Sequence, residues 1–375
     1  MVYKRAKIFA IAFIIIFVIY FTQDFTLINI EKTALIVTLG IDKTENEYTV
    51  TTQIAVPEGS KNQNNNSEAV ISSNGKTIYE AVSNISDRTG WYPKLSFCNL
   101  IVLGESMLAE NVMDVIDFFI RSYKVEDSAI ICACEGEAKE LMLSSSPLDT
   151  ISGLSLSKIF VKDYSGASKI LPTSIKEFCS NYYSLSSFGF MPYVKTVLTD
   201  ESGIGGKTST ASSSTTKPSS GNSESKGGEG QQKLVVYDAG SCLLFNKGYQ
   251  VGTLSSDETL CYSFLYKRVG ESFLNVVATT NEGKTGNVLL NILRTNKKIE
   301  FKIKDNKPTL YINLKVWARI SDADFSESIG EISNAGRLND NIKFKLKSKI
   351  EENILNVVNV SKNTSSDVFQ IKNLL

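Results

Sequence analysis

The chain has 375 residues with 40 Lys and Arg against 40 Asp and Glu, so its formal net charge is zero and no overall positive field would attract nucleic acid. It contains no histidine, which excludes the usual general base of serine and cysteine hydrolases and the two-histidine zinc site of common metalloproteases. Enzymes that use paired carboxylates or a Ser-Lys pair remain open, and the length allows two or three domains.

The N-terminus carries an apolar run, residues 8 to 21, directly after basic residues at positions 4, 5 and 7. A cleaved secretory signal would need small residues after this run, and a lipoprotein signal would need a cysteine there, but the first cysteine is Cys98. We therefore expect residues 1–24 to be a retained single transmembrane helix, although the run is short against the roughly 20 residues that span a bilayer. Because basic residues stay on the cytoplasmic side, we expect a cytoplasmic N-terminus and a body outside the membrane.

Residues 25–200 are predicted to form an N-terminal α/β region, with a break near residue 145 that could divide it into two subdomains. Two apolar or alternating runs, 33–42 and 47–57, predict a hairpin, and Thr77 with Glu80 predicts the capped start of a helix. The other elements expected here are a long exposed loop at 57–76, strands at 97–104 and 128–134, and helices at 105–122 and 136–144.

Residues 201–232 consist mostly of Gly, Ser and Thr and are predicted to be a flexible linker. Such a composition cannot bury enough apolar surface to offset the entropy lost on ordering. The linker would separate the N-terminal region from a C-terminal α+β domain at 233–375. That domain is expected to hold a hairpin at 234–254, a helix at 256–267, strands at 299–303 and 310–318, and a long helix at 341–360.

Cys132 and Cys134 are two positions apart in a predicted strand, so both side chains would point to the same face. Two interpretations remain open: a redox or metal-binding pair, or small apolar side chains on a buried face. The six cysteines are too few and too irregularly spaced to predict a disulfide framework or a zinc cluster.

Some residues are candidates for a contact surface. Trp91 and Trp317 could be exposed, although each could also lie in a core. The first half of the long C-terminal helix carries Lys343, Lys345, Lys347 and Lys349. These lysines could meet a membrane surface or an acidic partner, or they could form the solvated side of a helix that lies on a sheet.

Several stretches, in order, resemble the Ger(x)C family, the C-type subunits of spore germinant receptors. They are "LIVTLGIDKTENEYTVTTQIAVP", with Gly40, Ile41 and Asp42, then "GKTIYEAVSNISDRTGWYPKLSFCNLIVLGESML", "VIDFFIRSYKV", "ACEGEAKELM", "GSCLLFNKGYQVGTLSSDET" and the tail "SSDVFQIKNLL". No single motif is catalytic, and the resemblance rests on their collinear order over most of residues 34–370.

The resemblance implies an α+β protein of several mixed-sheet domains with helices packed on them, acting in nutrient-triggered germination without chemistry of its own. Its partners would be a multi-pass A-type subunit and a permease-like B-type subunit, in the inner spore membrane. Family members are typically lipoproteins, so here the N-terminal transmembrane helix would replace the lipid. We predict no catalytic, cofactor-binding or metal-binding residues and no cofactor.

Two other functions remain open. One is a generic cell-surface scaffold or binding protein unrelated to germination. The other is a cell-wall hydrolase in which Asp114 and Asp117, or Glu137 and Glu140, act as acid and base. Carboxylates three residues apart share a helix face, whereas glycoside hydrolysis needs them roughly 5 to 9 Å apart across a cleft, so solvated helix faces are the simpler interpretation.

Overall fold

The computed structural model describes Arg5, residues 11–17 and most of the chain from Thr33 to Leu374. The gaps after Thr33 are residues 56–67, 123–124, 145–151, 162–168, 199–234, 267–270, 280–284, 305–306, 325–332 and 335–336. The predicted anchor at 1–24 therefore lies largely outside the described residues, and the predicted linker lies wholly outside them. In the part of the chain that the structure describes, no helix has both the length and the apolar character needed to span a bilayer.

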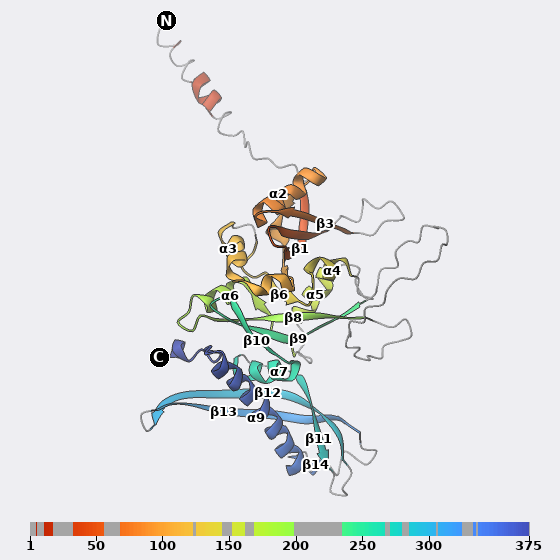
Figure 1. Cartoon of the computed structure of the whole chain (residues 1–375), viewed down its shortest axis with the longest axis vertical. Coiled ribbons are helices and arrows are strands. Elements are labelled where there is room, and N and C mark those ends of the chain that lie inside the picture. The colour runs from red at the N-terminus through yellow and green to blue at the C-terminus, as the bar shows by residue number, and fades with distance from the viewer. Residues whose placement is uncertain are drawn as a thin grey trace, which may run out of the picture.

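A mixed sheet of ten strands forms the larger part of the molecule, in the order β10-β9-β8-β6-β5-β1-β2-β3, with β4 on β1 and β7 on β6 (Figure 1). At its centre β8, β6, β5 and β1 run parallel, and antiparallel strands flank them on both sides. The predicted hairpin at 33–57 is confirmed as β1 and β2. The strands are β1 (Thr33–Lys43), β2 (Tyr48–Ala55), β3 (Glu68–Gly75), β4 (Tyr92–Lys94), β5 (Leu100–Leu103), β6 (Ile130–Cys134), β7 (Thr173–Ser174), β8 (Phe188–Leu198), β9 (Val235–Asn246) and β10 (Tyr249–Leu254).

Helices cover both faces of this sheet. One face packs on α2 (Ile78–Thr89), α3 (Met113–Ser122) and α6 (Ile175–Tyr182), and the other on α4 (Ala138–Leu143) and α5 (Ser152–Phe160). In β5, Ile101 and Leu103 point into the first core, whereas Leu100 and Val102 point into the second. A strand buried on both sides has a continuous apolar sequence, which is why this strand could be predicted.

The predicted helix at 105–122 is instead two elements, the 3-10 turn η4 (Glu105–Ala109) and α3. The side-chain oxygen of Asn111 accepts a hydrogen bond from the backbone N–H of Met113 (3.0 Å) and so caps a new helix start. The N–H of Val112 donates to the carbonyl of Gly248, in the turn between β9 and β10 (3.0 Å). Contacts from distant parts of the chain therefore break the apparent single helix.

The strand β3 lies where the sequence predicted only a loop, and this prediction was wrong for residues 68–75. It pairs with β2 along its whole length. Its two serines are hydrogen-bonded: Ser72 Oγ is 2.9 Å from Thr51 Oγ1, and Ser73 Oγ donates to the carbonyl of Ala81. The serine hydroxyls of this strand thus have partners that a local sequence pattern does not reveal.

The large sheet contains strands from both sides of the predicted linker, although a separate domain was expected after the linker. The strand β9 follows the predicted linker, yet it pairs antiparallel with β8, from Phe188 opposite Asn246 to Leu198 opposite Val235. The strand β10 then pairs with β9. The region expected as a C-terminal domain at 233–375 therefore supplies two strands to the sheet of the N-terminal region.

A second, smaller sheet lies at the other end of the longest axis from α2 (Figure 1). It is antiparallel, in the order β11-β12-β13, and α7 and α9 form a core with it. The predicted strands at 299–303 and 310–318 and the helices at 256–267 and 341–360 are confirmed within these elements. Their bounds are α7 (Ser256–Tyr266), β11 (Ser272–Thr279), β12 (Thr285–Lys304), β13 (Lys307–Ala323) and α9 (Asp340–Asn363), with short elements β14 (Ser333–Asn334), β15 (Arg337–Leu338), η3 (Leu95–Phe97) and η5 (Ile371–Leu374).

Candidate functional site

The side chain of Asp42 lies where the carboxyl ends of β1, β5 and β6 meet. It is 6% exposed, and its two carboxylate oxygens accept hydrogen bonds from the backbone N–H groups of Ala138 (2.8 Å) and Lys139 (3.0 Å). These two residues begin α4, whose own N-cap residue, Glu137, makes no side-chain cap. Asp42 therefore caps a helix that is far away in sequence, with its negative charge at the positive end of the helix dipole.

Burial raises the pKa of the Asp42 carboxyl, and the two backbone hydrogen bonds oppose that rise. Two glycines make room for this arrangement. A Cβ atom at Gly40 would lie 2.5 Å from a sulfur atom of α4, and one at Gly104 would lie 1.9 Å from Asp42 Oδ1. The "GID" sequence of β1 and the glycine after β5 thus have a common structural cause, which is the close packing of α4 on the carboxyl ends of β1 and β5.

Glu105 ties the same segments together. Its backbone N–H donates to the carbonyl of Gly136 (2.8 Å), and its Oε2 accepts a hydrogen bond from the backbone N–H of Gly136 (3.1 Å). Ligands of α/β proteins commonly bind at the carboxyl ends of parallel strands. Here two of the acidic groups at that edge, Asp42 and Glu105, are hydrogen-bonded to the protein backbone, which favours a structural role for these two.

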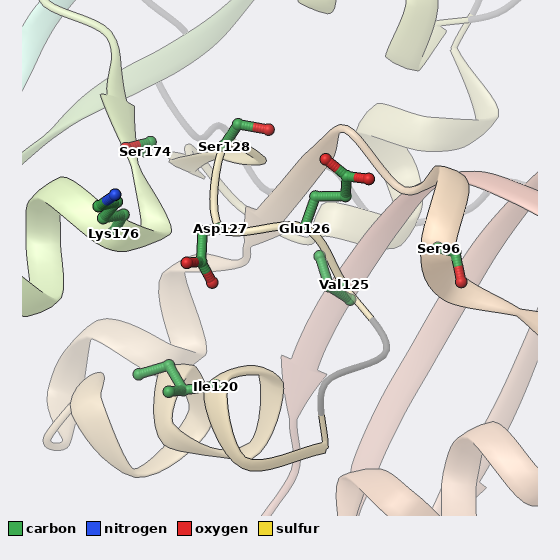
Figure 2. Close-up of a pocket in the computed structure, with 8 residues that line it drawn as sticks. All are labelled: Ser96, Ile120, Val125, Glu126, Asp127, Ser128, Ser174 and Lys176. Atoms are coloured by element: carbon green, nitrogen blue, oxygen red, sulfur yellow. The ribbon is translucent and has the colours of Figure 1, made fainter.

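A hollow of about 850 Å³ opens at the opposite edge of the sheet, near the amino ends of β5 and β6. Figure 2 shows its lining, which consists of Ser96, Ile120, Val125, Glu126, Asp127, Ser128, Ser174 and Lys176. The carboxylates of Glu126 and Asp127 point to opposite sides of their loop (Figure 2), so they do not face each other as an acid and base would across a glycosidic bond. Among the residues that the structure describes, no group of three or more His, Cys, Asp or Glu could hold a metal ion.

The acidic residues of the hydrolase alternative lie on helices. Asp114 and Asp117 are on α3, where Asp117 forms an ion pair with Arg121 of the same helix. Glu137 precedes α4, and Glu140 is in its first turn. None of these four acidic residues lines the hollow. Neither pair therefore lies together in this hollow.

The cysteine pair of β6 is buried. Cys132 and Cys134 are both 0% exposed and belong to the core beneath α4 and α5, whereas Ala133 between them faces the opposite core. Burial raises the pKa of both thiols and so keeps them protonated, and neither is in a disulfide. These facts favour the interpretation as small apolar core residues.

The surface candidates are exposed. Trp91 and Trp317 are each 45% exposed, and the guanidinium of Arg294 lies 5.4 Å from the centre of the Trp317 ring. Three of the four helix lysines are in ion pairs: Lys343 with Asp340, Lys347 with Glu351, and Lys349 with Asp257. The pairs of Lys343 and Lys347 lie within α9 and favour the solvated side of a helix for these two lysines, whereas Lys349 is half-buried and pairs with Asp257 of α7.

Asp257, at the start of α7, joins the two sheets. Its carboxylate contacts the ammonium groups of Lys169, before β7, at 2.6 Å and of Lys349, in α9, at 2.7 Å. Burial acts to raise the pKa of this carboxyl, but the hydrogen bonds from the two lysines outweigh it and the pKa is lowered. The sequence offered no signal for this cluster because its three members are far apart along the chain.

The C-terminal tail is held by a second polar cluster, which sequence reasoning missed. Asp367 accepts hydrogen bonds from Ser186 Oγ (2.7 Å) and from the two backbone N–H groups of residues 371–372 (2.8 Å each). The hydroxyl of Tyr262 donates to the carbonyl of Val368 (3.0 Å). The "DVF" sequence of the tail was the only available signal, and its role is to fix the tail against the large sheet and α7.

Comparisons with known proteins show what this chain resembles. A family model described as the spore germination protein N-terminal domain matches residues 27–196, and a model described as spore germination B3/GerAC like, C-terminal, matches residues 239–375. Spore germination protein B3 of Bacillus subtilis (strain 168) is 24% identical over 317 residues, which are 83% of this chain and 74% of that protein. A crystal structure of the GerBC protein aligns with a TM-score of 0.47 and 20% identity, covering 90% of this chain and 86% of that one.

The two family models follow each other in the order in which the resembling stretches occur, and together they span most of the chain. The chain is therefore a member of the Ger(x)C family, and its role is in spore germination.

Proposed function

We propose that this protein is a membrane-tethered, non-enzymatic subunit of a spore germinant receptor, and that it acts through contacts with other receptor proteins. The observation that carries the proposal is the match of both family domains, in tandem, to residues 27–196 and 239–375. If the protein were a generic scaffold without a role in germination, the presence of both domains in this order would have no explanation.

A role without catalysis is supported by how the acidic groups are used. Asp42 and Glu105 are hydrogen-bonded to the backbone of neighbouring loops, and Asp117 is paired with Arg121. The chain has no histidine that could serve as a general base. Contact with partners then remains as the means by which the protein acts.

The tether is the apolar run at residues 8 to 21, with the basic residues before it on the cytoplasmic side and the body outside, at the inner spore membrane. The partners are a multi-pass A-type subunit and a permease-like B-type subunit. The tether is supported by the apolar run that directly follows basic residues, and the partners are supported by the family.

The test is deletion of the gene followed by a nutrient-triggered germination assay, with release of the spore core contents as the readout. Complementation with two versions of the gene separates the parts of the proposal: one encodes the full chain, and the other a chain that lacks residues 1–24. We expect the full chain to restore germination and the shortened chain to fail, with normal spore yield and heat resistance in all strains. A full nutrient response in the deletion strain would contradict the proposal.

A further inference from the structure

Residues 90–97, "GWYPKLSF", form an exposed aromatic segment between α2 and β5. Trp91 is 45% exposed, Tyr92 42% and Phe97 54%, and we call these three side chains the aromatic rim. Leu95, between them, is 2% exposed and belongs to the core, so the segment is fixed to the body of the protein. The rim is therefore a formed surface in which large aromatic groups face outward.

The rim lies next to the point at which the described chain enters the large sheet. The strand β4 pairs in parallel with the start of β1, so that Tyr92 is opposite Thr33 and Pro93 is opposite Ala34. Neighbouring strands in a sheet are about 4.8 Å apart. Figure 1 shows the start of β1 with α2 at one end of the longest axis and the sheet of β11, β12 and β13 at the other.

The length of the connecting segment limits how far this end can be from a membrane. The apolar run ends at Phe21, and residues 22–32 join it to Thr33. Even a fully extended chain of that length reaches only about 40 Å. With the run inserted in a bilayer, Thr33 must lie within this distance of the end of the run, and Tyr92, opposite Thr33 on the neighbouring strand, is only about 5 Å farther away.

The side chains of this segment suit the interface between lipid and water. Trp and Tyr concentrate at the headgroup level because their rings are apolar and their N–H and O–H groups are polar. Lys94 lies among them, with its Nζ 5.8 Å from the centre of the Phe97 ring. A lysine at such a position can bury its methylene groups and keep its ammonium group among the headgroups.

We propose that the aromatic rim of Trp91, Tyr92 and Phe97 rests on the lipid surface, at the level of the headgroups. The α2 end of the molecule then faces the bilayer, and the sheet of β11, β12 and β13 points away from it. This inference rests on the proposed N-terminal tether, and it adds an orientation that the tether alone does not set.

The two tryptophans of the chain make a direct test possible, because Trp91 is in the rim and Trp317 is in β13, at equal exposure. The full chain is reconstituted in lipid vesicles as two variants, Trp317→Phe, which leaves Trp91, and Trp91→Phe, which leaves Trp317. Fluorescence is measured with lipids brominated near the headgroup and with acrylamide in the water. A third variant, Phe97→Trp with both natural tryptophans replaced by Phe, reports on a second rim position.

We expect brominated lipids to quench Trp91 at least about twofold more than Trp317, and acrylamide to show the reverse order. The Phe97→Trp variant should behave like the Trp91 variant. Equal quenching of both tryptophans in vesicles that retain the chain would overturn the orientation and leave the tether intact. Failure of the chain to float with the vesicles would overturn the tether, and with it the orientation. Protection of Trp91 from acrylamide that appears only when partner subunits are added, without quenching by brominated lipid, would assign the rim to a protein contact and also overturn the inference.

Discussion

The structure makes its sharpest prediction for the substitution Asp42→Ala. The change removes two charge-assisted hydrogen bonds, at 2.8 Å to the N–H of Ala138 and 3.0 Å to that of Lys139. Ala138 is buried, so its N–H would have no access to water, whereas Lys139 is exposed. A buried unpaired N–H costs about 1–3 kcal/mol, and loss of an N-cap costs about 0.5–2 kcal/mol.

Together these effects predict that Asp42→Ala lowers the stability of α4 against local opening by about 2–4 kcal/mol. We expect a value in the lower half of this range, because the cost of burying the carboxylate offsets part of the stabilisation that its hydrogen bonds provide. The substitution Asp42→Asn keeps one acceptor oxygen and should cost about half as much.

Hydrogen–deuterium exchange of the full chain measures this directly. An opening free energy lower by 2–4 kcal/mol speeds exchange of the α4 amides by about 30-fold to 1000-fold. The control is Asp87→Ala, at an exposed position in α2, which should change exchange in α4 by less than about 2-fold. Unchanged exchange at residues 138–143 in Asp42→Ala, or equal effects of both substitutions, would refute the reasoning.

Three more predictions concern the close packing at Gly104, the ion pairs of Asp257 and the burial of the cysteines. Gly104→Ala should be destabilising by about 2 kcal/mol or more in urea unfolding, because its Cβ would lie 1.9 Å from a buried oxygen of Asp42, and a neutral result would contradict this close packing. Asp257→Asn should lower the free energy of unfolding at pH 7, and the difference in stability from the natural chain should shrink below pH about 4. The pKa of Asp257 is lower in the folded than in the unfolded chain, so its stabilising effect is present above the unfolded pKa and is lost as the pH falls through the folded pKa. A loss of stability that does not depend on pH would argue against the ion pairs. In native protein at pH 8 a thiol reagent should label Cys179 before the other cysteines, because Cys179 is the least buried of them. The labelling should still be slow, since burial raises the pKa of this thiol to about 11. Rapid labelling of either cysteine of β6 would contradict their burial.

Elements whose determinants are local could be predicted from the sequence. The apolar spacing and the Thr77 cap predicted α2, and the structure has Thr77 Oγ1 accepting a hydrogen bond from the N–H of Glu80 at 3.1 Å. The second bond of the expected capping box goes instead from the N–H of Lys76 to the Glu80 carboxylate. The long helix α9 was likewise predicted because its apolar residues recur at helical spacing. Ile342, Leu346 and Ile350 face the core of the smaller sheet, and Val357 faces a core with Phe188 and Phe190 of the large sheet.

Features that depend on distant pairing could not be predicted. The strands β8 and β9 pair across residues 199–234, and no local pattern shows that a strand after such an insert returns to the first sheet. No local pattern around Asp42 indicates that its carboxylate caps a helix that begins 96 residues later. Contacts between segments far apart in the sequence decide both features.

Purification of the tagged protein from spore membranes in mild detergent, under its own promoter, tests the central claim most directly. We expect a multi-pass protein and a permease-like protein to be recovered with it in fixed proportion, and this recovery to withstand repeated washing. Recovery of the protein alone, from membranes in which both other proteins are present and extracted, would contradict an action through contact with receptor partners.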